Sequence, residues 1–184
     1  GESDHVAKWL ELGVRDRRPA QYKAAVEDLL ASRVLDNLED SYTEELHARA
    51  PELIERYASA FQSSAALIPQ DSGCCNVRLT DQGPLFYDWA DVVIGHSTFS
   101  CDRLLDQAPR EDHDAIIEAF LEPLHIPRPE FNAMRRSNVL HEVLRYHDEL
   151  QHIPESNQVH QNLANSVRSQ LRVLLDHERK HSSS

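Results

Sequence analysis

The chain has 184 residues, which is the length of one domain with a core of its own. Lys and Arg number 19 against 31 Asp and Glu, and the formal charge of −12 argues against a nucleic-acid or anionic-membrane partner. The same charge suits a cationic substrate, although solvated helix surfaces explain most such charges. The low glycine content, 5 residues, and the many Leu, Ala, Glu and Arg residues favour helix over sheet.

The three cysteines, Cys74, Cys75 and Cys101, form no Cys-x-x-Cys pair. The sequence therefore indicates neither a zinc site nor a disulfide framework. Reduced thiols are typical of a cytoplasmic protein, and the cytoplasm is the expected location. No apolar run approaches the ~20 residues that span a bilayer. The first residues have no signal-peptide character, and Gly1 in place of Met is interpreted as a processed or engineered start.

The first third of the chain has the apolar period of helices. We predict a short helix over 4–12, ended by Gly13, and a longer one over 19–38. A third helical run covers 41–65, where Ser41 or Thr43 can cap the first turn. Pro51 lies inside this run, and proline disrupts a helix interior. The pattern therefore predicts two helices or one kinked helix.

Residues 66–89 lose the helical period. Residues 77–79 alternate as in a short strand, 80–84 have turn chemistry, and 85–87 form a second short strand. This pattern predicts a β-hairpin, which needs a helical body to support it. Further helices are expected over 97–106, 111–123, 129–151 and 155–178, followed by a disordered tail at 181–184. The fold class is therefore mainly α (α+β), with one small β-hairpin.

Three polar residues around the hairpin form the candidate site. Asp71 and Asn76 are five positions apart in a loop, and Asp88 ends the second predicted strand. Phosphoryl transfer needs a positioned base and oxygen ligands for Mg²⁺, and Mg²⁺ prefers one or two carboxylates with water and phosphate. A tight hairpin would return Asp88 to the loop. Asp and Asn also populate ordinary polar turns, so that reading stays open.

The residues around this trio carry a resemblance to a known family. The segment 71–77, Asp-Ser-Gly-Cys-Cys-Asn-Val, resembles the catalytic loop of the aminoglycoside phosphotransferases, which commonly reads His-Gly-Asp-Leu-His-x-Gly-Asn-Val. The segment 85–89 resembles the family's strand that ends in Asp-Trp. The segment 91–96 resembles the stretch that follows it and often ends in Gly-His or Gly-Asp before a proline.

This resemblance implies a fold and an activity. The chain 1–184 would be a single domain, the helical C-terminal lobe of a kinase-like fold. It would transfer the γ-phosphate of ATP to the hydroxyl of a small molecule, as aminoglycoside and choline kinases do. Asp71 would be the catalytic base, and Asn76 and Asp88 would bind Mg²⁺ and through it ATP. Acidic residues such as Glu111, Asp112 or Glu142 are candidates for contacts to a cationic substrate.

The sequence also departs from the family pattern. Pro69 stands where the loop histidine is usual, Gly73 where a second histidine is frequent, and Cys75 where a glycine precedes the Asn. Ser97 replaces the proline, and Ser100 stands where some members have Asp. A Gly-to-Cys change restricts the backbone of the loop. These departures keep open a second hypothesis, a non-catalytic kinase-like lobe that acts as an interaction module.

The N-terminal ATP-binding lobe of such kinases has no counterpart in the sequence. Residues 4–65 are helical in pattern, and no glycine-rich phosphate loop appears. The chain is expected to be either a fragment or a lobe with another use. A missing lobe would leave apolar surface, so self-association is expected. The 11 histidines include His141, His147 and His152, whose spacings of six and five do not favour a shared metal site.

Overall fold

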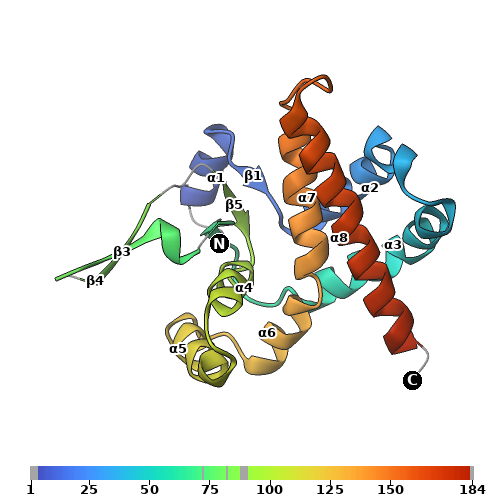
Figure 1. Cartoon of the computed structure of the whole chain (residues 1–184). Helices are drawn as coiled ribbons and strands as arrows, with labels where there is room; N and C mark the ends of the chain where they lie inside the picture. Colours follow the sequence, from blue (N-terminus) through green and yellow to red (C-terminus); the bar gives the residue numbers. More distant parts are fainter. Residues whose placement is uncertain (1–3, 72, 82, 88–90, 183–184) are drawn as a thin grey trace. The chain divides into compact units, whose positions relative to one another are not determined.

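The structure, a computed structural model, describes residues 4–71, 73–81, 83–87 and 91–182. It is mainly helical with short strands, as the composition predicts (Figure 1). Contacts divide the chain into two compact units, residues 1–21 with 60–135 and residues 22–59 with 136–184. The single domain expected from the length stays a prediction. Among the described residues, no helix is both long and apolar enough to cross a membrane.

The first unit contains a three-stranded sheet that the sequence interpretation lacks. Strand β5 (Val92–Gly95) lies in the centre, parallel to β1 (Arg15–Asp16) and antiparallel to β2 (Ala66–Pro69). Val93 and Ile94 are fully buried, so β5 has no polar face and gives no alternating pattern. Strands of two to four residues are too short to leave a period in the sequence.

The body of the first unit also contains helices and the 3₁₀ turn η3. They are α1 (Asp4–Glu11), α4 (Thr98–Gln107), η3 (Arg110–Asp112), α5 (His113–Leu124) and α6 (Arg128–Arg135). One apolar core joins α4, α5 and α6, and it consists of Cys101, Leu105, Ile117, Leu121, Ile126 and Phe131. The helices predicted over 97–106 and 111–123 are confirmed to within a few residues.

The predicted hairpin is confirmed. The turn η2 (Cys74–Asn76) leads into β3 (Val77–Thr80), which pairs with β4 (Gly83–Phe86) in antiparallel register. Thr80 Oγ1 donates a 2.7 Å hydrogen bond to the carbonyl of Gly83, and Gly83 has a φ of +111°, which favours glycine. The hairpin extends away from the sheet of its own unit (Figure 1).

The second unit is built from helices. They are α2 (Pro19–Leu30), η1 (Arg33–Asn37), α3 (Asp40–Ala60), α7 (Asn138–Leu150) and α8 (Gln158–Ser182). One prediction needs correction here, and one pair of alternatives is narrowed to a single helix. The helix expected over 19–38 ends at Leu30 and resumes as the 3₁₀ turn η1, and α3 continues through Pro51 as one helix. Tertiary packing outweighs a local proline preference, since Tyr57 in α3 stacks on Tyr22 with ring centroids 3.7 Å apart.

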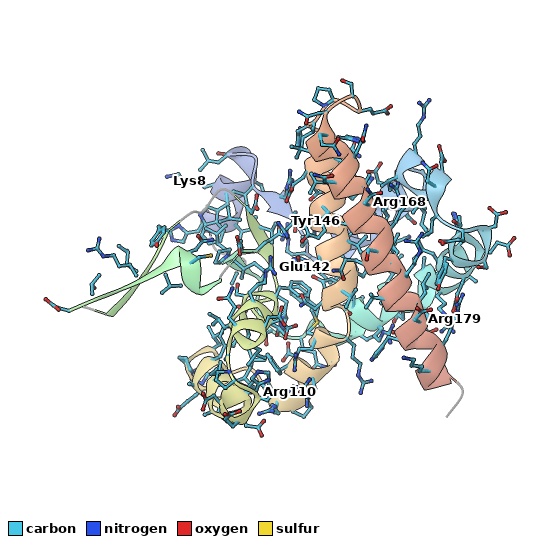
Figure 2. All side chains as sticks on the ribbon, in the orientation of Figure 1. Lys8, Arg110, Glu142, Tyr146, Arg168 and Arg179 are labelled. Carbon is cyan, nitrogen blue, oxygen red and sulfur yellow. The ribbon has the colours of Figure 1, made fainter. Side chains whose placement is uncertain are left out.

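Helices α7 and α8 lie side by side as a helical hairpin (Figure 1). The single helix predicted over 129–151 is wrong, because α6 ends at Arg135 and α7 begins at Asn138. The break falls where the chain passes from the first unit to the second. Ion pairs connect α3 to α8, with Arg56 Nη2 2.9 Å from a Glu178 carboxylate oxygen and Arg179 Nε 2.6 Å from one of Glu45 (Figure 2 labels Arg179).

Candidate functional site

The loop between β2 and β3 brings two of the three predicted site residues together. Strand β2 ends at Pro69, and the η2 turn forms as Asn76 N–H donates to the carbonyl of Gly73 at 2.8 Å. The Asn76 side chain then reaches back, and its Nδ2 donates to the main-chain carbonyl of Asp71 at 3.0 Å. That bond leaves the Asn76 Oδ1 oxygen as a potential ligand for a cation.

The hairpin returns to the same loop. Tyr87 N–H donates to the carbonyl of Asn76 at 3.0 Å, and the Tyr87 hydroxyl donates to the carbonyl of Cys75 at 2.9 Å. The residue just before Asp88 is therefore bound directly to the loop. Asp88 itself, the third predicted site residue, lies outside the described residues, as does Trp89.

Asp71 is accessible and faces a cation on α4. Its side chain is 42% exposed, and its Oδ1 lies 3.9 Å from Nε of Arg103, whose side chain is 33% exposed. Within the described part of the chain, no group of three or more His, Cys, Asp or Glu side chains forms a metal site. Of the two predicted Mg²⁺ ligands, Asn76 is described, and its amide oxygen is of the type that Mg²⁺ accepts together with carboxylates, water and phosphate.

The structure shows the surroundings of Pro69, Gly73 and Cys75, the loop residues that depart from the phosphotransferase pattern. Pro69 belongs to β2, and its carbonyl accepts a 3.0 Å hydrogen bond from Ser100 Oγ. Gly73 is buried, and a Cβ atom there would lie 2.8 Å from Nε2 of Gln107. A histidine at this position would therefore displace Gln107. Cys75 is exposed, so its side chain takes no core position.

The sequence did not point to a buried pair in the first unit, His96 and Glu130. One carboxylate oxygen of Glu130 accepts three hydrogen bonds, from the N–H of Gln62 at 3.1 Å, from the N–H of Ser63 at 2.6 Å and from Nε2 of His96 at 3.0 Å. The side chains of His96 and Glu130 are 0% and 3% exposed. Because these partners lie more than 30 positions from Glu130 in the chain, no local pattern points to them.

The hydrogen bonds around His96 and Glu130 determine the tautomer of His96 and the direction of both pKa shifts. The Thr98 N–H donates to Nδ1 of His96 at 3.3 Å, so the His96 proton lies on Nε2 and is donated to Glu130. Burial lowers the pKa of His96, and Glu130 offsets this only in part. Burial alone would raise the pKa of Glu130, but the hydrogen bonds from His96, Ser63 and Gln62 outweigh it and hold the pKa below 4.5.

These pKa shifts predict that the protein loses stability as the pH is lowered. The unfolded state protonates His96 near its ordinary pKa of 6.5, whereas the folded state resists the proton until lower pH. The unfolded state therefore binds more protons below pH 6.5, and the folded state loses stability there. Glu130 adds a second loss as the pH falls below 4.5 towards its folded pKa. We expect the free energy of urea unfolding to be lower at about pH 5.5 than at about pH 7.5.

Substitutions separate the contribution of His96 to this pH dependence from the contributions of the other histidines. His96→Gln should flatten this pH dependence, whereas His152→Gln, at an exposed position, should leave it unchanged. Equal slopes in the wild-type chain and in His96→Gln would contradict the assignment.

Among the residues that the structure describes, the other candidate residues form no hydrogen bond or ion pair with Asp71 or Asn76. Glu111 and Asp112 are exposed in η3, and Glu142 on α7 accepts from Arg145. His141 and His147 are buried in α7, and His147 Nδ1 lies 3.8 Å from a carboxylate oxygen of Asp28.

The second unit also has an open pocket of about 980 Å³ between residues 28–37 and 147–168. Its lining carries both signs of charge, with Asp28 and Glu155 against Arg33 and Arg168 (Figure 2 labels Arg168). Neither Asp71 nor Asn76, the two predicted site residues that the structure describes, lines it. The mixed lining favours no class of ligand.

Comparison with known proteins adds no family to this picture. No protein-family model matches the chain, and no curated protein matches it. The resemblance of residues 71–96 to phosphotransferases therefore stays a prediction that depends on its residues and on the geometry of the loop.

Proposed function

We propose that the chain is a phosphotransferase-type domain, the C-terminal lobe of a kinase-like fold related to aminoglycoside and choline kinases. It transfers the γ-phosphate of ATP to a hydroxyl of a small molecule, with Asp71 as the base and Asn76 and Asp88 as Mg²⁺ ligands. The observation that carries the proposal is the loop itself. Asn76 is bonded to Asp71, and Tyr87 returns the second strand of the hairpin to Asn76.

The proposed chemistry divides between the residues and the cofactor. Mg²⁺ with ATP supplies the phosphoryl group and neutralises its developing charge. Asp71 would accept the proton of the acceptor hydroxyl while the hydroxyl oxygen bonds to the γ-phosphorus, the bond from that phosphorus to the bridging oxygen of ATP breaks, and ADP leaves. The described residues 4–65 form helices and the two-residue strand β1, so the strand lysine and phosphate loop of a kinase N-terminal lobe would come from elsewhere. We place the protein in the cytoplasm, consistent with Cys75 and Cys101 as free thiols.

A second function is favoured by the altered loop. In this alternative, with Pro69 in the sheet and Cys75 before Asn76, the lobe is a non-catalytic interaction module. Exposed apolar residues, Leu12, Leu85 and Tyr87 among them, offer contact surface in the first unit. Self-association through such surface remains part of this alternative.

One experiment separates the two functions. Mg²⁺ and ATP are titrated by calorimetry into this chain and into any longer protein that contains it, and phosphate transfer to amino alcohols and amino sugars is then assayed. We expect Mg²⁺-dependent ATP binding and transfer, with Asn76→Ala weakening the Mg²⁺ dependence. If neither protein binds Mg²⁺-ATP or transfers phosphate, the interaction module is the better account.

A further inference from the structure

One face of α4 supports the loop that carries Asp71. Ser100, Arg103 and Gln107 lie at positions i, i+3 and i+7, which share a face of a helix. Ser100 Oγ donates to the carbonyl of Pro69, and Gln107 lies against Gly73. Between these two contacts, Arg103 faces the carboxylate of Asp71.

The pairing of Arg103 with Asp71 is the loosest of the three contacts. The Nε–Oδ1 distance of 3.9 Å exceeds a hydrogen bond, and Arg103 Nε has no hydrogen-bond acceptor among the described residues. An exposed ion pair of this kind contributes little to stability. Its effect is on orientation, because a guanidinium offers several donors in a fixed plane to a carboxylate.

The loop around Asp71 lacks the histidine that the aminoglycoside phosphotransferases, which this loop resembles, usually have two residues before the base. Pro69 holds that position, and its side chain has no donor. The described residues give Asp71 no other cationic partner than Arg103. Arg103 on α4 is therefore the described cation that faces the proposed base.

We propose that Arg103 is the positioning residue of this site, which holds the Asp71 carboxylate towards the acceptor hydroxyl. This inference rests on the proposed function, since positioning has meaning only if Asp71 acts as the base. Arg103 itself touches neither substrate nor cofactor in this role. It acts through Asp71, and its removal lowers the rate of transfer and leaves acceptor binding in place.

The contact is tested first without any activity. In the ¹³C-labelled protein at fixed neutral pH, the Asp71 ¹³Cγ signal is assigned by its loss in Asp71→Asn. We expect Arg103→Gln to shift this signal and Arg103→Lys to shift it less. The matched control is Arg110→Ala, at an exposed arginine of the same unit (Figure 2), which should leave the signal in place.

The positioning role is tested by kinetics on the same variants. Misplacement of a catalytic group costs about 10- to 100-fold in rate, so we expect kcat of Arg103→Gln to fall by that factor. The KM for the acceptor should stay within about threefold, and Arg103→Lys should recover part of kcat. The melting temperature should shift by no more than about 4 °C, as for an exposed ion pair.

The outcomes distinguish this inference from the proposed function. If the Asp71 ¹³Cγ chemical shift is the same in Arg103→Gln as in the wild-type protein, the contact is refuted, whatever the result of the transfer assay. If the signal moves while kcat of an active protein is unchanged, the positioning role is refuted. If the wild-type protein transfers no phosphate, the proposed function fails, and a signal that still responds shows Arg103 and Asp71 to be an ion pair without a catalytic role.

Discussion

Glu130→Ala is expected to destabilise the protein by about 3–5 kcal/mol, the cost of breaking a buried hydrogen-bonded pair. The substitution removes the acceptor for three donors at once, namely the N–H groups of Gln62 and Ser63 and the Nε2–H of His96. The hydrogen bond from His96 is buried and those from Gln62 and Ser63 are part-buried. A buried donor left without a partner costs about 1–3 kcal/mol. The loss also reaches the site, since residues 62–63 lead into β2 and His96 follows β5.

Urea unfolding and thermal melting measure this effect. For a chain of this size, the predicted loss lowers the melting temperature by about 6–20 °C. Glu130→Gln keeps one acceptor oxygen and should cost less than Glu130→Ala. The matched control is Glu118→Ala, whose 69% exposed side chain pairs with Arg128 in the same unit and should cost less than about 1 kcal/mol. A loss from Glu130→Ala as small as that of the control would refute the assigned role of the pair.

Under the proposed function, Asp71→Asn is expected to lower phosphate transfer by about 10²- to 10⁴-fold, the usual contribution of a positioned general base. Asparagine has nearly the same shape but cannot accept the proton of the acceptor hydroxyl. Because the Asp71 side chain is 42% exposed, the substitution should change the free energy of unfolding by less than about 0.5 kcal/mol. The loss should therefore appear in kcat of a folded protein.

The control for this prediction is Asp81→Asn. Asp81 is an exposed residue in the turn between β3 and β4. That variant should transfer phosphate at the wild-type rate. ATP binding measured by calorimetry should be similar in both variants, since Asn76 and Asp88 are the proposed Mg²⁺ ligands. Full activity in Asp71→Asn would remove Asp71 from the role of base.

Local features of the fold follow from the sequence. The periods over 97–106 and 111–123 predict α4 and α5, and the turn residues 80–84 predict the hairpin, because these patterns arise from neighbours in the chain. The proximity of Asp71 and Asn76 is also local, since five residues in a tight loop cannot separate far. Longer helices are less predictable, as the break between Arg135 and Asn138 shows.

Contacts between distant residues were decided only by the tertiary structure. Arg15 pairs with Val93 in the sheet, and Glu130 binds Gln62. Arg103 meets Asp71 across 32 positions. No period or spacing in the sequence encodes such pairs, because their members lie far apart in the chain and meet only when the chain folds. The sequence by itself determined which residues are candidates for chemistry, and packing decided which cation faces Asp71.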